Sequence, residues 1–411
     1  MKTILIIGAG QAGGRAAMTL REAGFSGRIV LAGDEAERPY ERPPLSKQVL
    51  TAPDDATCFD AWLHPQSMYD EQRVEWCHER VCALDLDAHH ATFASGELLR
   101  WDACLFATGG SARTLPMLDG HPHVVTLRTL ADAMHLRERL SRTRRLVIVG
   151  GGFLGLEVAA SARQRNLEVT VIEAADALLQ RALPQHFARR LQEKHEAHGV
   201  AFRLGATLAA STTNGEHIAL TLAGGELIDA DLCLVAIGQR PNDALARAAG
   251  LATDNGIVVD AHCRTSHADV YAAGDCTNFP LHPDGSRVRL ESWQNAQEQA
   301  AVAARNLLGE RTMYRVTPWF WTDQFDWNIQ MLGAPGATVD TWVERRTSAD
   351  RTLLMGLRGP VITQAIAVNS GGDLRAIRRL VDEAVPVDRE ALTNPAIKLR
   401  QIERLPDLER L

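Results

Sequence analysis

Residues Ile4–Gly13 read ILIIGAGQAG, an apolar run followed at once by glycines spaced Gly-x-Gly-x-x-Gly. The apolar run predicts a buried strand, and the amphipathic stretch Arg15–Ala23 predicts a helix. In such a turn the first glycine permits a tight bend, the second allows close approach to the backbone, and the third lets helix and strand pack closely. A second apolar run, Arg28–Ala32, ends in Gly33-Asp34. The stretch therefore predicts a strand–turn–helix–strand unit.

The same pattern occurs a second time. Arg145–Gly155 reads RLVIVGGGFLG, and a helix-like stretch, Leu156–Arg165, leads to another apolar run, Glu168–Ile172, and then to Glu173. One such glycine motif is a weak signal because glycine-rich turns are common. Two motifs in the same local context are a strong signal, and they predict an α/β fold with two dinucleotide sites.

An acidic residue follows each glycine motif. Asp34 lies 21 residues after Gly13, and Glu173 lies 18 residues after Gly155. In sites of this kind the helix N-terminus receives the pyrophosphate, and the carboxylate accepts hydrogen bonds from the adenosine ribose. A carboxylate at Glu173 would also repel a 2′-phosphate, which favours NADH over NADPH. Three nearby arginines work against that preference: Arg163, Arg165 and Arg181.

Bulk composition limits the other possibilities. A chain of 411 residues is too long for one ordinary core, which predicts two or three domains. The net charge of −7 argues against a nucleic-acid partner, and no apolar run is long enough to span a membrane. Seven cysteines without framework spacing indicate a reducing compartment. We expect a cytoplasmic protein that binds neither nucleic acid nor membrane.

Two further strand-like runs end in small-residue turns, Leu105–Gly110 (LFATGG) and Val270–Asp275 (VYAAGD). With these, the chain closely resembles the two-dinucleotide flavoprotein reductases. Within them it is similar to the ferredoxin reductases that serve aromatic-ring dioxygenases and haem-thiolate monooxygenases. The resemblance covers essentially the full chain, and its most specific pieces are Arg38–Lys47, Ala107–Gly109, Tyr271–Asp275, Glu291–Ala296 and Pro318–Gln324.

The resemblance implies that the first glycine motif binds FAD. Arg42 and Lys47 would approach the pyrophosphate and flavin, and Val81 would contact the cofactor through its backbone. Asp275 would hold the ribityl chain, and the segment around Trp293 would cover the ring system. The full implied set is Gly8, Gly10, Gly13, Asp34, Arg42, Lys47, Val81, Thr108, Gly109, Arg128, Asp275 and Trp293.

The resemblance also implies that the second motif binds NADH. The implied set is Gly150, Gly152, Phe153, Leu154, Gly155, Glu157, Glu173, Arg181 and Gly238. Three positions depart from the family pattern. Gly14 stands where a larger residue is common, which predicts a looser helix start. Gln239 and Arg240 stand where these reductases usually have apolar residues.

The implied chemistry is that of the flavin, which takes a hydride from the nicotinamide and releases electrons singly, because an iron–sulfur centre accepts one at a time. Lys47 would help electrostatically, with Glu157 as its paired carboxylate. The alternative is that Lys47 caps a helix or pairs with phosphate. The implied catalytic set is Lys47, Glu157, Trp293 and Trp321.

Four of the eight tryptophans lie between Trp293 and Trp327. Alternation along a strand would place Trp319 and Trp321 on one face. We expect Trp321 and Trp293 to line the flavin edge where a partner docks, and Trp319 and Trp327 to pack in the core.

The implied partner is a [2Fe–2S] ferredoxin, of Rieske type or plant type, and the reductase would be a monomer or homodimer. Ferredoxins of this kind are acidic, so a basic rim would steer them. Five arginines close to Trp293 in sequence are candidates for that rim: Arg287, Arg289, Arg305, Arg311 and Arg315.

Other functions stay open at this point. A flavin-dependent disulfide reductase needs two cysteines beside the flavin, and Arg42–Lys47 contains none. Cys77 and Cys82 are expected to be buried structural thiols, and Cys276 a packing residue. A peroxide or quinone acceptor is another alternative. A flavin-bound interaction protein with vestigial activity is less favoured, because the second glycine motif is intact.

Histidine pairs do not suggest a metal site. His89-His90 and His121–His123 lack companion ligands at the usual spacing, and we expect them in loops.

The expected architecture is α/β, with two Rossmann-like dinucleotide-binding domains plus a C-terminal α+β interface domain. The FAD-binding domain would comprise 1–112 and 241–318, the NADH-binding domain 113–240, and the C-terminal domain 319–411. In the last part, Val361–Asn369 predicts a strand and Leu374–Glu383 a helix.

Overall fold

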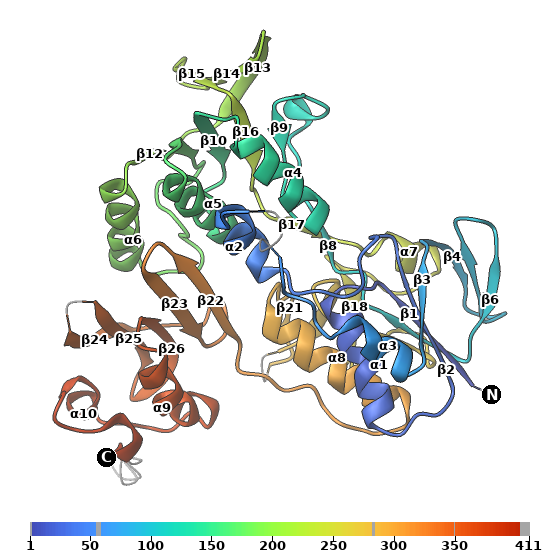
Figure 1. Cartoon of the computed structure of the whole chain (residues 1–411). Helices are drawn as coiled ribbons and strands as arrows, with labels where there is room; N and C mark the ends of the chain where they lie inside the picture. Colours follow the sequence, from blue (N-terminus) through green and yellow to red (C-terminus); the bar gives the residue numbers. More distant parts are fainter. Residues whose placement is uncertain (1, 55–58, 282–283, 349, 403–411) are drawn as a thin grey trace. The chain divides into compact units, whose positions relative to one another are not determined.

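The computed structural model describes residues 2–54, 59–281, 284–348 and 350–402 (Figure 1). The chain forms two compact units. The first comprises Met1–Arg144, Ser211–Ile218 and Ala230–Val316, and the second comprises Arg145–Ala210, Ala219–Asp229 and Thr317–Leu411.

The first unit is built on a five-stranded parallel sheet. Its strand order is β19 (Val270–Ala272), β7 (Ala103–Phe106), β1 (Thr3–Ile7), β2 (Arg28–Gly33) and β3 (Val74–His78). Every residue of β1 is buried, as expected for a central strand covered on both faces. Two helices lie side by side in this unit, α1 (Gln11–Glu22) on β1 and β2, and α8 (Trp293–Leu307) on β7 and β19 (Figure 1).

Shorter elements complete the first unit. A small antiparallel sheet joins β4 (Val81–Asp85), β5 (His90–Phe93) and β6 (Leu98–Arg100). The remaining elements are η1 (Pro43–Ser46), α2 (Gln48–Thr51), α3 (Gln66–Glu71), β8 (Gly110–Ala112), η2 (Pro116–Leu118), β9 (Val124–Val125), α4 (Leu130–Leu140), β16 (Leu232–Val235), β17 (Gln239–Pro241), α7 (Ala244–Ala248), β18 (Ile257–Val258), β20 (Thr277–Pro280) and β21 (Arg287–Val288).

The second unit begins with a parallel strand set. β10 (Arg145–Val149), β11 (Glu168–Ile172) and β12 (Val200–Arg203) pair in parallel, with α5 (Phe153–Gln164) and α6 (Gln185–Ala197) connecting them. The chain passes between the two units in β13 (Leu208–Asn214), β14 (His217–Leu222) and β15 (Leu227–Ala230).

The rest of the second unit is an antiparallel sheet with helices. Its strand order is β22 (Trp319–Gln324), β23 (Trp327–Leu332), β26 (Val361–Val368), β25 (Arg351–Arg358) and β24 (Thr341–Ser348). It is followed by α9 (Gly371–Asp382), α10 (Arg389–Thr393) and η3 (Leu399–Gln401).

Both faces of this antiparallel sheet are covered. Along β25, Leu353 packs with Leu374 and Ile377 of α9, whereas its neighbour Leu354 packs in a separate cluster with Leu156 of α5. The two sets alternate because successive strand side chains point to opposite faces. The sheet is therefore buried between α9 on one side and α5 and α6 on the other.

The helices that follow the glycine motifs begin earlier than predicted. α1 begins at Gln11 rather than Arg15, and α5 begins at Phe153 rather than Leu156. The reason is that the third glycine of each motif already lies in the first helical turn. The predicted looser start at Gly14 is wrong, because Gly14 is buried inside an unbroken helix.

Two smaller expectations are also wrong. His90 begins strand β5 rather than lying in a loop, and His89 stacks on Trp101 with ring centroids 4.4 Å apart. Cys82 is exposed and Cys77 only half-buried. The pairing register shifts between Val81 and Ala83, so Cys82 is the extra residue of a β-bulge and faces outward.

None of the described helices is both long and apolar enough to cross a membrane.

Candidate functional site

The two glycine turns have the same construction. Gly8 and Gly150, the first glycine of each, have positive φ angles of 109° and 113°, which favour glycine. A Cβ on Gly13 would lie 1.9 Å from the carbonyl oxygen of Gly8, and a Cβ on Gly155 would lie 2.1 Å from that of Gly150. The third glycine of each motif is thus required for the helix to approach the strand.

The middle glycines face open space. A Cβ on Gly152 would meet nothing within 4 Å among the described atoms, and one on Gly10 would meet only Nη2 of Arg42 at 3.6 Å. Gly10 and Gly152 are the N-cap residues of α1 and α5, and in the described structure no side chain caps either helix. Each turn therefore offers room and free N–H groups, a cradle that fits a pyrophosphate.

Sheet topology points to the same place in the first unit. β2 and β3 extend the sheet on one side of β1, whereas β7 and β19 lie on its other side. Ligands of open α/β sheets bind outside the carboxyl ends of the strands at such a reversal. The turn after β7 lies against Gly8, because a Cβ there would be 2.2 Å from the carbonyl oxygen of Ala107. Gly109 in that turn has a φ of 61°.

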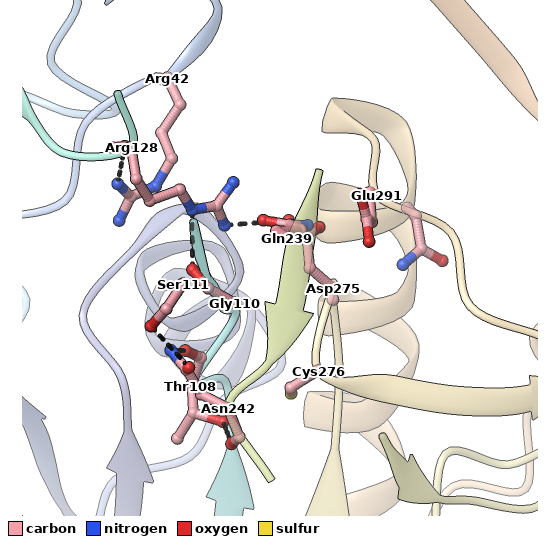
Figure 2. A network of polar contacts seen from close by, with 12 residues as sticks. Arg42, Thr108, Gly110, Ser111, Arg128, Gln239, Asn242, Asp275, Cys276 and Glu291 are labelled. Carbon is pink, nitrogen blue, oxygen red and sulfur yellow. Dashed lines mark hydrogen bonds and ion pairs between the residues drawn. The ribbon is translucent and has the colours of Figure 1, made fainter. Parts of the chain in front are cut away.

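Asp275 follows β19 and is the centre of a polar network (Figure 2). Its Oδ2 accepts hydrogen bonds from Nη2 of Arg128 and from Nε2 of Gln239, each at 3.0 Å. Arg128 also donates from Nε to the carbonyl oxygen of Gly110 at 2.9 Å, and Arg42 donates to the carbonyl oxygen of Arg128 at 2.6 Å. The structure therefore brings together three predicted site residues, and it adds Gln239.

Glu35 is a second addition that sequence reasoning missed. Its carboxylate accepts from Nη2 of Arg42 at 2.5 Å and from the hydroxyl of Tyr40. Burial raises the pKa of Tyr40, so this phenol stays protonated and donates. Asp34, the predicted ribose partner, is exposed one residue past the end of β2. Glu173 likewise follows the last residue of its strand, β11, directly.

A second small network joins β8 and β17, which pair antiparallel. The Thr108 hydroxyl donates to the backbone carbonyl oxygen of Asn242 at 2.7 Å, and the side-chain amide of Asn242 donates to the backbone carbonyl oxygen of Thr108 at 2.9 Å. The Ser111 hydroxyl donates to the side-chain amide oxygen of Asn242 at 2.8 Å (Figure 2). Asn242 thus holds the turn that carries Thr108 and Gly109.

Other predicted residues of the first unit lie at loop and helix ends. Lys47 follows η1, and its Nζ donates to the carbonyl oxygen of Pro43 at 3.1 Å. Trp293 begins α8, and its ring N–H donates to Glu41 at 3.3 Å. Val81 is buried at the start of β4.

In the second unit, Glu173 is tied to its glycine turn. Its Oε2 accepts the backbone N–H of Gly151 at 2.7 Å, and its Oε1 accepts that of Ala175 at 2.8 Å. A half-buried carboxylate is therefore held beside the second cradle, as a ribose-binding residue must be. Arg181 is exposed, and Gly238, with a φ of 95°, belongs to the first unit.

The start of α5 carries the remaining predicted residues. The ring of Phe153 lies 4.7 Å from that of Phe320, and Leu154 is half-buried beside it. Glu157 is 6% exposed, and its Oε1 accepts a hydrogen bond from the hydroxyl of Thr322 at 2.6 Å.

The tryptophans of β22 confirm the predicted alternation. Trp319 and Trp321 stack with ring centroids 5.0 Å apart. Trp319 and Trp327 are half-buried, and both pack against core clusters as expected, Trp327 by stacking on Phe187.

The candidate basic rim is smaller than its five arginines suggest. Arg289 pairs with Glu291 and has a side chain 11% exposed, and Arg287 donates to backbone carbonyl groups. Three arginines of the set present exposed side chains: Arg305, Arg311 and Arg315.

The cysteines described are reduced, and four of them are fully buried: Cys104, Cys233, Cys263 and Cys276. Burial raises the pKa of the Cys233 thiol to about 12 and also raises that of Cys276. The packing role expected for Cys276 is therefore confirmed. Within the described ranges, no group of three or more His, Cys, Asp or Glu side chains is placed to hold a metal ion.

The fold and its paired glycine turns define a dinucleotide-binding α/β protein. The family model for pyridine nucleotide-disulphide oxidoreductases matches residues 2–300, and the reductase C-terminal model matches residues 319–403. The chain belongs to the pyridine nucleotide-disulphide oxidoreductase family.

Curated relatives are similar over nearly the full length. The 3-phenylpropionate/cinnamic acid dioxygenase ferredoxin–NAD(+) reductase component of Photorhabdus laumondii is 38% identical over 92% of this chain and 96% of that protein. The anthranilate 1,2-dioxygenase system ferredoxin–NAD(+) reductase component of Burkholderia cepacia is 41% identical over 96% of this chain and 98% of that protein.

Solved structures show the same likeness. A ferredoxin reductase from Rhodopseudomonas palustris is 32% identical with a TM-score of 0.93, and the match covers 98% of this chain and 99% of that one. The reductase of a covalent putidaredoxin reductase–putidaredoxin complex is 32% identical with a TM-score of 0.92, covering 97% of each chain.

Proposed function

We propose that this chain is an FAD-dependent NADH:ferredoxin reductase of a dioxygenase or cytochrome P450 electron-transfer system. The observation that carries the proposal is the pair of open glycine cradles, one with Asp275 and one with Glu173 beside it. The family supports two dinucleotides, and the full-length relatives support ferredoxin as the acceptor. We favour an aromatic-ring-hydroxylating dioxygenase as the system that it feeds.

The chain's own residues would divide the work. The first cradle would hold the pyrophosphate of FAD, with Arg42 and Arg128 supplying positive charge. Asp275 would accept hydrogen bonds from the ribityl hydroxyls, because one of its oxygens is already held by Arg128 and Gln239. The bound flavin would supply the chemistry, taking two electrons from NADH and passing them on singly.

The second cradle would hold NADH. Glu173 would accept hydrogen bonds from the adenosine ribose and disfavour a 2′-phosphate. Glu157, buried and held by Thr322, would bind the nicotinamide half. Lys47 stays the proposed electrostatic partner of Glu157 and of the flavin.

A three-part division of the chain is part of the proposal. The FAD-binding part would be 1–112 and 241–318, the NADH-binding part 113–240, and the C-terminal part the residues from 319 onward. The antiparallel pairing of β8 with β17 supports these limits, because the two strands end at the proposed boundaries, Ala112 and Pro241. We propose a cytoplasmic location, in keeping with reduced cysteines in the described chain.

Anaerobic stopped-flow mixing tests the function. NADH should bleach the flavin absorbance of the purified protein quickly, NADPH should do so slowly, and a [2Fe–2S] ferredoxin should then reoxidise it. Bleaching without reoxidation by Rieske-type or plant-type ferredoxins would reopen disulfide, peroxide and quinone acceptors. Absence of bleaching by either nucleotide would contradict the reductase assignment.

A further inference from the structure

A buried chain of hydrogen bonds runs from α6 through β22 to α5 in the second unit. The imidazole Nε2 of His195 lies 2.8 Å from Oε1 of Gln324, and Nε2 of Gln324 donates to the hydroxyl of Thr322 at 3.1 Å. That hydroxyl donates to Oε1 of Glu157 at 2.6 Å. His195, Thr322 and Gln324 are each 0% exposed.

The direction of every bond follows from the chemistry at the Glu157 end. Thr322 donates to Glu157, so the single proton of its hydroxyl is used in that bond. Thr322 can therefore only accept from Gln324, which places the amide NH2 of Gln324 toward Thr322. The amide oxygen then faces His195, so His195 must donate from Nε2.

The state of His195 agrees with this direction. Burial lowers the pKa of His195 to about 4, so the ring is neutral near pH 7. Its single proton lies on Nε2, and Nδ1 has no hydrogen-bond partner among the described residues. The three hydrogen bonds thus run in one direction, the last of them ends at Oε1 of Glu157, and each bond polarises the next.

We infer that His195, Gln324 and Thr322 are positioning residues that hold Glu157 in the orientation that binds the nicotinamide half of NADH. The inference deepens the proposed function and rests on it. It also assigns a role to the antiparallel C-terminal sheet, since β22 supplies two of the three positioning residues to a helix of the nucleotide-binding segment. An isolated buried carboxylate would lack this support and could turn to other rotamers.

The test compares two ligands on the oxidised holoprotein by calorimetry. NAD⁺ reaches both Glu173 and Glu157, whereas ADP-ribose lacks the nicotinamide and reaches Glu173 only. Thr322→Val removes the hydroxyl at nearly constant shape. It should weaken NAD⁺ binding roughly 10- to 100-fold, the factor expected for one hydrogen bond to a charged group, and leave ADP-ribose binding unchanged.

Conservative and matched variants complete the design. Thr322→Ser keeps the hydroxyl and should restore NAD⁺ affinity. Thr352→Val changes another buried threonine of the same sheet and should leave both ligands unaffected. If Thr322→Val does not fold, Thr322→Ala takes its place, because it removes the hydroxyl without adding a buried methyl group. It should likewise weaken NAD⁺ binding and leave ADP-ribose binding unchanged.

The outcomes separate the inference from the proposed function. Unchanged NAD⁺ affinity in Thr322→Val, or equal losses for both ligands, would overturn the positioning role while leaving the reductase assignment intact. Failure of the unaltered protein to bind either ligand would overturn the proposed function and this inference with it.

Discussion

The side-chain amide of Gln239 donates a 3.0 Å hydrogen bond to the carboxylate of Asp275, in the same unit and on the same oxygen that accepts from Arg128. Both donors use Oδ2, so neither of these hydrogen bonds occupies Oδ1, the oxygen that would accept from a hydroxyl of FAD in the proposed function.

Gln239→Leu should therefore weaken FAD binding by about 10-fold, since Asp275 loses one of its two side-chain donors. Fluorescence titration of the apoprotein with FAD measures the change. Arg240→Leu is the control, because Arg240 is the exposed neighbour on the same strand. Equal affinities in the two variants would remove Gln239 from the site.

The glycine turns allow binding and folding to be tested separately. Gly10→Ala and Gly152→Ala add a methyl group in open space, so each should fold normally and lose one dinucleotide, FAD and NADH respectively. Gly13→Ala places a Cβ 1.9 Å from a carbonyl oxygen and should destabilise the fold by about 1–3 kcal/mol or more. Thermal melts and flavin content distinguish the three variants.

Glu173 should set the nucleotide preference. Glu173→Ala removes the proposed ribose partner and the negative charge, so kcat/KM for NADH should fall about 10-fold while that for NADPH rises. Steady-state ferredoxin reduction with both nucleotides checks this. Glu193→Ala, an exposed glutamate on α6, serves as the control. An unchanged ratio would place the ribose elsewhere.

His195 should make the protein sensitive to acid. Its pKa is lowered to about 4 in the folded state, against about 6.5 in the unfolded chain. Between these values the unfolded chain binds more protons, so the free energy of unfolding falls as the pH falls from about 6.5 to 4, by about 3 kcal/mol in total. Chemical denaturation across this range measures the slope.

The matched variants for that slope are His195→Gln and His135→Gln. Replacing His195 removes the buried titrating group and should flatten the acid limb, whereas replacing the exposed His135 should not. Identical pH dependence in all three proteins would show that His195 does not titrate in this way.

The exposed arginines should steer the ferredoxin. Charge reversal at Arg305, Arg311 and Arg315 should raise the KM for ferredoxin about 10-fold at low salt, with flavin reduction by NADH unchanged. The difference from the unaltered protein should shrink as salt rises. Arg142→Glu, exposed on the loop after α4, is the control. A salt-independent KM would locate docking elsewhere.

Local sequence patterns were sufficient to predict the strands and helices around the two glycine turns and the turns themselves. Apolar runs, glycine spacing and the following helices depend on neighbouring residues, so β1, β10, β11 and the positions of Gly8 and Gly150 could be predicted. The helix starts could not, because a glycine motif does not reveal that its last glycine is already helical.

Partners that meet from distant parts of the chain were decided only by the tertiary structure. Gln239 and Asp275 are far from Arg128 in sequence, yet the three side chains form one network. In the other network, His195 of α6 and two residues of β22, Gln324 and Thr322, are linked by hydrogen bonds to Glu157 of α5. Such contacts depend on which faces the sheet buries. The exposure of Cys82 followed from a bulge for the same reason, because strand register is set between strands and not within one. The sequence by itself thus determined the fold class and the two nucleotide cradles. The tertiary structure decided which side chains orient the groups beside them.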